Sequence, residues 1–125
     1  MRTTHLTLLG ALMIGAAGLL VALPTAPAAA QTALQPKEGW FSVLTTFDKV
    51  RPLATIPPKK GVAIIDSRPA ARQYDPGHIP GAINIPDSAF EKSVDKLPAD
   101  KATRLIFYCG GLDCMLSHDS AKKAK

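Results

Sequence analysis

The stretch 105–117 constrains the fold more than any other part of this sequence. It reads LIFYCGGLDCMLS: an apolar run, a cysteine, two glycines and a short turn, followed by a polar segment with helical spacing. A buried strand that ends at Cys109 and a helix that begins near Met115 leave only residues 110–114 for the turn. The sequence therefore predicts a strand–turn–helix unit with a thiol at the bottom of a cup.

Backbone chemistry in this turn favours a negatively charged sulfur. Gly110 and Gly111 can adopt positive φ without a Cβ penalty, so consecutive N–H groups can point at one anion. The N-terminus of the following helix adds positive partial charge, which lowers a cysteine pKa. Cys109 is therefore the candidate nucleophile, and a half-buried structural cysteine is the alternative.

Residues 1–30 have the composition of a secretory signal peptide. A short basic start precedes an uncharged apolar run over 6–23, and a Pro- and Ala-rich segment follows it. We expect cleavage after Ala30, a periplasmic or secreted location, and no membrane association after cleavage. A retained anchor is the alternative, because the apolar run reaches the lower length limit of a spanning helix.

The charge and the cysteines exclude some classes of function. The chain has 15 Lys and Arg against 10 Asp and Glu, with only 6% aromatic residues. The charges are interleaved, so we expect no nucleic-acid binding and only a modest attraction for small anions. A disulfide between the two cysteines would close a very small loop, which argues against a stabilising staple.

Apolar runs alternate with helical patterns in the second half of the chain. Residues 31–60 are predicted to be a leader and then a first strand, or a strand running into a helical turn, over 40–47. In residues 61–125 we expect strands at 62–66, 82–86 and 105–108, and helices at 69–74, at 89–97 and from 115 onward. This alternation predicts an α/β domain with a mainly parallel sheet, whose ligands bind beyond the carboxyl ends of the strands.

Four parts of the sequence resemble successive motifs of the rhodanese-like (sulfurtransferase) domain family. They are IIDSR at 64–68, Tyr74, GHIPGAINIP at 77–86 and FYCGG at 107–111. The resemblance implies a small three-layer α/β domain with a central parallel sheet. Family domains usually continue to another strand and a final helix, so we expect residues 61–125 to be an incomplete domain.

The resemblance also implies a sulfurtransferase reaction at Cys109. The thiolate attacks a sulfane sulfur of a small sulfur-containing anion or persulfide donor and carries it as a persulfide. The sulfur then passes to a thiol or another nucleophilic acceptor, which can belong to a protein, without a metal or organic cofactor. The amides expected to hold the anionic sulfur are those of Gly110, Gly111, Leu112, Asp113 and Cys114.

The sequence departs from the family pattern in this loop. Many members carry basic residues there, whereas this chain has Asp113 and Cys114. An acid in the cup is expected to weaken the binding of a dianion such as thiosulfate. Cys114 either fills space or attacks a persulfide on Cys109, releasing hydrosulfide and leaving a disulfide.

Two further residues and three further functions stay open. Arg68 either assists a substrate anion or pairs with an acid, and His118 either supports the thiolate or lies exposed on its helix. The functional alternatives are a non-catalytic binding module, a thiol–disulfide redox protein using both cysteines, and a phosphatase- or arsenate-reductase-like enzyme. Residues 110–125 lack the arginine that the last chemistry requires, which ranks it lowest.

Overall fold

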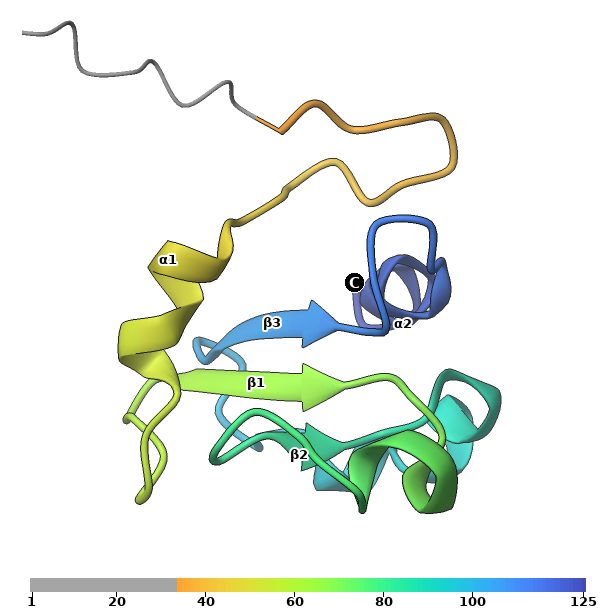
Figure 1. The fold of residues 1–125 in the computed structure, drawn as a ribbon. Coiled ribbons are helices and arrows are strands. Elements are labelled where there is room, and N and C mark those ends of the chain that lie inside the picture. Colours follow the sequence, from red (N-terminus) through yellow and green to blue (C-terminus); the bar gives the residue numbers. More distant parts are fainter. Residues whose placement is uncertain (1–33) are drawn as a thin grey trace, which may run out of the picture. The chain divides into compact units, whose positions relative to one another are not determined.

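The computed structural model describes residues 34–125, so the predicted signal peptide lies outside the described residues. Strands β1 (Val62–Asp66), β2 (Ile83–Asn84) and β3 (Arg104–Tyr108) form one parallel sheet in the order β2-β1-β3 (Figure 1). The predicted α/β class with a parallel sheet is confirmed. No helix within 34–125 combines the length and apolar character that a membrane crossing requires.

The central strand β1 is buried because its neighbours pair with both of its edges. Its partners run from Val62 opposite Arg104 to Asp66 opposite Tyr108 in β3, and Ile65 lies opposite Ile83 in β2. Alternate side chains enter two apolar clusters on opposite faces of the sheet. The first contains Ala63, Ile65, Ile85 and Phe90, and the second contains Val50, Ile64 and Ala82.

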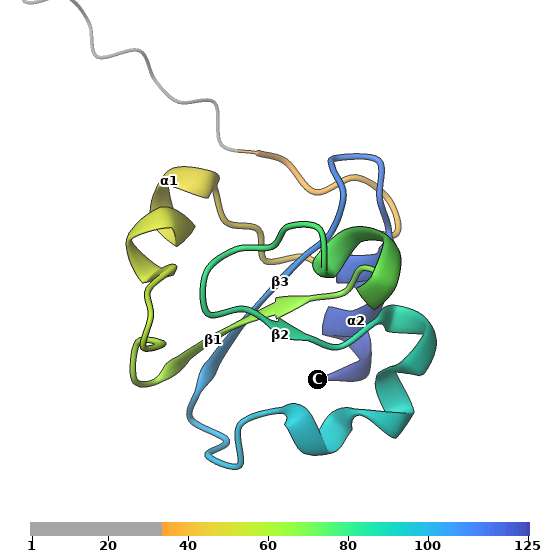
Figure 2. The same ribbon diagram turned by 60° about the horizontal axis from the view of Figure 1, so that its bottom comes forward.

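Helical segments cover both faces, as a three-layer domain requires. Helix α1 (Phe47–Val50) and the 3-10 turn Arg51–Leu53 contribute Val50 and Leu53 to the second cluster. Helix α2 (Leu116–Lys123) packs on the first face (Figure 2). Its C-cap residue Ala124 contacts the first cluster. The expected start of α2 near Met115 is confirmed, since Met115 is its N-cap.

The connection between β2 and β3 differs from the prediction. Instead of one α-helix over 89–97, the chain forms two 3-10 segments, Asp87–Lys92 and Val94–Lys96. Ser93 separates them with a φ of −128°, and Ala89 also leaves helical geometry. Phe90 is buried but Val94 is 45% exposed, so the apolar spacing does not form one continuous stripe.

Other boundaries shift for local reasons. No strand forms over 40–47 in the described chain, and α1 begins only at Phe47. The predicted strand 82–86 is reduced to Ile83–Asn84, because the Ala82 N–H donates to the Ile79 oxygen in a turn instead of to β1. The Ile85 N–H still donates to the Asp66 oxygen, and Pro86 has no N–H to continue the ladder. The predicted helix after Pro69 is a single π-helical turn, Ala70–Tyr74, with Pro69 as its N-cap.

Candidate functional site

Cys109 is the first residue after β3, at the carboxyl end of the sheet. Leu105 and Phe107 face the first apolar cluster, and Cys109 continues this alternation toward α2. Its Sγ atom lies 3.2 Å from the backbone oxygen of Cys114, to which the thiol donates, and 3.2 Å from Ser117 Oγ. The side chain is thus enclosed by its own loop and the first turn of α2.

The turn that encloses the thiol does not need left-handed glycines. Among the described residues, the positive-φ glycines are Gly39, Gly61 and Gly81, so the predicted positive φ at Gly110 and Gly111 is wrong. The Cys114 N–H instead donates to the Gly111 oxygen at 3.1 Å, which closes a tight turn. This hydrogen bond directs the Cys114 amide into the loop.

The pKa of the Cys109 thiol is raised, which reverses the direction predicted from the loop and the helix N-terminus. Burial is the main cause, and the hydrogen bond to the Cys114 thiol adds to it. The hydroxyl and amide of Ser117 act in the opposite direction but do not outweigh these effects. The thiol form of Cys109 is therefore favoured at neutral pH.

Cys114 is the more acidic of the two thiols. Burial raises its pKa, but the hydrogen bond from the Cys109 thiol and those from the Gly110 and Leu116 amides outweigh that effect, and the charge of Arg68 also contributes. The pKa of Cys114 is therefore lowered. The predicted amide cup thus acts in part on the second sulfur instead of the first.

The remaining predicted loop residues face solvent. The side chain of Asp113 is 97% exposed and lies 3.5 Å from Lys37 Nζ, and Leu112 is 64% exposed. Water screens such a charge strongly. The expected repulsion of a dianion by Asp113 therefore loses its structural basis.

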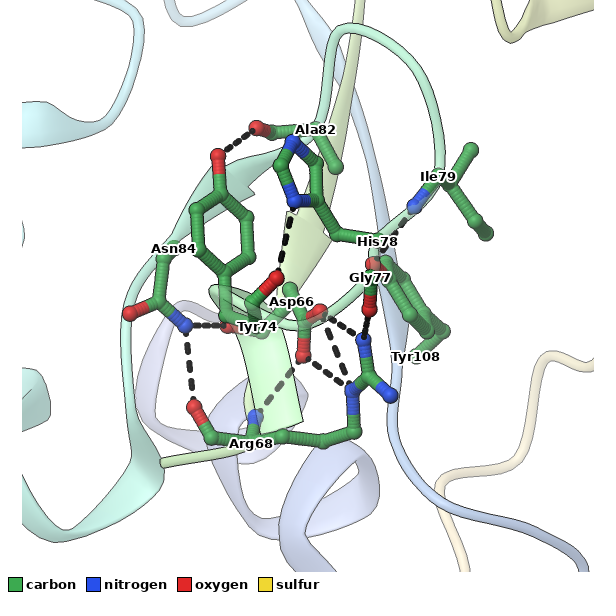
Figure 3. A network of polar contacts seen from close by, with 9 residues as sticks. All are labelled: Asp66, Arg68, Tyr74, Gly77, His78, Ile79, Ala82, Asn84 and Tyr108. Carbon is green, nitrogen blue, oxygen red and sulfur yellow. Dashed lines mark hydrogen bonds and ion pairs between the residues drawn. The ribbon is translucent and has the colours of Figure 1, made fainter. Parts of the chain in front are cut away.

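Arg68 pairs with an acid, which was the structural alternative for this residue. Its Nη2 atom lies 2.6 Å from Asp66 Oδ2 and also donates to the Gly77 oxygen at 2.9 Å (Figure 3). Burial alone would raise the pKa of the Asp66 carboxyl. Hydrogen bonds from Arg68 and Tyr108 and the guanidinium charge outweigh burial, so this pKa is lowered. The carboxylate is fully buried and remains charged.

The same network holds the turn-rich segment 77–86 in place. The Ile79 N–H donates to Tyr108 Oη at 3.1 Å, and Asn84 Nδ2 donates to the backbone oxygens of Asp66 and Arg68 (Figure 3). Tyr74 Oη donates to the Ala82 oxygen at 2.9 Å. Burial is the main reason that the pKa of Tyr108 rises to about 12.

His118 anchors the segment that precedes α1. Its Nδ1 atom accepts the Phe41 N–H at 3.2 Å, and its ring stacks on Trp40 with 4.8 Å between centroids. Burial lowers the pKa of His118, and the Lys122 charge adds to this, while Asp119 opposes it. The neutral ring is thus engaged by the leader segment, in place of the predicted support for a thiolate.

A cavity of about 780 Å³ opens beside β3 and α2, and Cys109 lies in its wall. Trp40, Leu44 and Phe107 make other parts of the wall largely apolar, while Ser117 contributes a hydroxyl. Within residues 34–125, no group of three or more His, Cys, Asp or Glu side chains is arranged to hold a metal ion. The cavity gives a small molecule access to Cys109.

Ser117 is the site residue that the sequence reasoning left without a role. It follows the second cysteine by three positions, on the first turn of the helix. A polar residue in the first helical turn after a cysteine loop could have been predicted to contact the cysteine, because the side chains and amides of that turn face the loop.

Comparisons with known proteins agree with the fold. The sequence profile described as the rhodanese-like domain matches residues 51–125. A region of 64 residues is 36% identical to part of an HTH-type transcriptional regulator of Mycobacterium tuberculosis, covering 51% of this chain and 27% of the regulator. The chain thus spans about a quarter of the length of that curated relative. No solved structure matches the chain.

Proposed function

Because the chain belongs to the rhodanese-like domain family, we propose that it is a sulfurtransferase that carries sulfane sulfur as a persulfide on Cys109. The observation that carries this proposal is the position of Cys109: a half-buried thiol directly after β3, at the carboxyl end of a parallel sheet and in the wall of a cavity. Ligands of such sheets bind at that end.

The reaction begins with deprotonation of Cys109. The Cys109 thiol donates to the Cys114 backbone oxygen at 3.2 Å, and Cys114 has the lower pKa of the two thiols. Cys114 therefore ionises before Cys109, and its thiolate accepts the Cys109 proton. The Cys109 sulfur attacks the outer sulfur of a persulfide or polysulfide donor. The sulfur–sulfur bond of the donor breaks, and Cys109 carries the outer sulfur. The donor leaves as a thiolate and takes the proton from Cys114, which becomes a thiolate again.

Ser117 holds the reacting sulfur in position. Its hydroxyl and its backbone amide both interact with Cys109 Sγ and lower the pKa of that thiol. As charge develops on the sulfur during attack, these donors stabilise it.

We propose a location outside the cytoplasm for this reaction, because residues 1–30 have the composition of a signal peptide.

Intact-mass analysis tests the assignment. The Cys114→Ser chain, incubated with inorganic polysulfide at pH 10 so that Cys109 ionises unaided, is expected to gain about 32 mass units, one sulfur. The matched control is the double variant Cys109→Ser, Cys114→Ser, which is expected to gain nothing. Equal gain in both, or no gain with polysulfide, thiosulfate or a small persulfide while circular dichroism shows folded protein, would refute the proposal and favour a binding module.

A further inference from the structure

We propose that Cys114 is a resolving thiol, which discharges the sulfur carried by Cys109 as hydrosulfide and leaves a Cys109–Cys114 disulfide for an external dithiol to reduce. This inference rests on the proposed function, since it requires a persulfide on Cys109. It assigns the product, hydrosulfide, and the electron source, a dithiol reductant, which the proposed function leaves open.

The loop geometry brings the two cysteines together. The Cys109 thiol donates to the backbone oxygen of Cys114 at 3.2 Å, and each of the two thiols shifts the pKa of the other. The turn closed by the Cys114 N–H and the Gly111 oxygen brings residue 114 back over the end of β3. Neither cysteine has to cross another element to reach its partner.

Cys114 is also free to move without disrupting a helix. It precedes the N-cap residue Met115, and α2 begins at Leu116. Gly111 has open space around the position of a Cβ atom, and the nearest atom to such a position at Gly110 is Gln73 Oε1 at 4.0 Å. The loop can therefore adjust to the specific dihedral angle that a disulfide requires.

The chemistry balances with the groups present and one named reductant. The Cys114 thiolate attacks Cys109 Sγ, the bond from that atom to the outer sulfur breaks, and the outer sulfur leaves with its proton as HS⁻. The protein has then lost two electrons to the departing sulfur. A dithiol returns them by thiol–disulfide exchange, which restores Cys109 and Cys114 and oxidises the dithiol.

The ionisation of the pair favours this direction of attack. The Gly110 and Leu116 amides hold the Cys114 sulfur as the more acidic thiol, and attack is fastest when the pKa of the attacking thiol lies near the ambient pH. A disulfide across so few residues removes little chain entropy from the unfolded state. Such a bridge is easily reduced, as turnover demands, and is a poor structural staple.

Single-turnover mass spectrometry tests the inference. The full chain and its Cys114→Ser variant are loaded with inorganic polysulfide at pH 10, where Cys109 of the variant ionises unaided, passed rapidly through a desalting column and followed without reductant. The unmodified chain is expected to release one equivalent of hydrosulfide and to end about 2 mass units below its dithiol form. The Cys114→Ser chain is expected to keep the added sulfur, about 32 mass units, until dithiothreitol is added.

The outcomes separate this inference from the proposed function. If the unmodified chain keeps its added sulfur as long as Cys114→Ser does, the resolving role is wrong and the sulfurtransferase proposal stands. If neither chain loads, the proposed function itself fails. A release rate that rises with protein concentration indicates resolution between molecules, and sulfur loaded on Cys114 in a Cys109→Ser chain reverses the order of the two thiols; either result overturns the assignment.

Discussion

Two polar regions lie at the carboxyl ends of the same parallel strands, and they are built in opposite ways. The first is the Asp66 network, formed by Asp66, Arg68, Asn84 and Tyr108 (Figure 3). The second is the cysteine loop, residues 109–114. Tyr108 faces the second apolar cluster, while Cys109 continues toward α2, so one peptide step at the end of β3 separates the two faces.

The difference lies in how fully each region is bonded. Asp66 accepts hydrogen bonds from the side chain and the amide of Arg68 and is fully buried, so its oxygens have no capacity left for a substrate. The Cys109 thiol instead has alternative partners in Cys114 and Ser117. A network whose hydrogen-bonding capacity is fully used stabilises the fold. A reactive thiol instead needs a second partner that can accept its proton.

The largest expected effect is on the Asp66 network. Replacing Asp66 by Ala leaves a mostly buried Arg68 without its counter-charge and is expected to lower the free energy of unfolding by about 3 kcal/mol. The matched control is Asp119→Asn, which removes an ion pair whose side chains are 44% and 46% exposed, with an expected loss of at most about 0.5 kcal/mol. Urea unfolding measures both, and equal losses would contradict the comparison.

The next largest effects are expected from alanine substitutions at two glycines, one in the segment 77–86 and one in the cysteine loop. Gly81 has a φ of +76°, and a Cβ atom there would lie 2.6 Å from the Thr55 backbone oxygen, so Gly81→Ala is expected to cost about 2 kcal/mol. Gly111→Ala meets open space at ordinary φ and is expected to stabilise the chain by about 0.5 kcal/mol.

Thermal unfolding of the two alanine variants checks these signs. Sulfur loading of Gly111→Ala adds a second measurement, because a stable variant that no longer loads would show that this glycine is needed for the approach of the donor. Destabilisation by Gly111→Ala would contradict the picture of a loop with room to adjust.

The sequence predicts the parts of the fold that depend on a single element. The apolar run of β1, the end of β3 and the start of α2 each follow from a local pattern, and they suffice to place Cys109 at the edge of the sheet. The family motif at 77–86 likewise marks real structure, since Ile79, Ala82 and Asn84 are bonded to the Asp66 network and Tyr74.

The sequence does not predict properties that depend on the exact direction of a few groups. The relative acidity of Cys109 and Cys114 is decided by which sulfur the Gly110 and Leu116 amides face, and a change in turn type alters that. The helix expected over 89–97 fails for a related reason, because the geometry at Ala89 and Ser93 divides it. The composition and spacing of the residues do not distinguish one turn geometry from another, or a continuous helix from a divided one.

The smallest expected effect is a pH dependence of stability that comes from His118 and does not involve the Asp66 network. The fold lowers the pKa of His118 through burial and the Lys122 charge, so the stability from its bond to Phe41 is full above about pH 6.5 and is lost as the pH falls through the lowered pKa. The lowered pKa of Asp66 keeps the network charged throughout this range.

Fluorescence of Trp40, the single tryptophan, reports this change because its ring stacks on His118. Protonated imidazole quenches indole emission, so the intensity is expected to fall on acidification with a midpoint below pH 6.5. His118→Gln is expected to abolish the transition, and His78→Gln, whose ring stacks on Tyr74, to preserve it. A midpoint above 6.5 would mean that a carboxylate, and not burial, dominates around His118, and it would assign the acid-sensitive contact to Asp119.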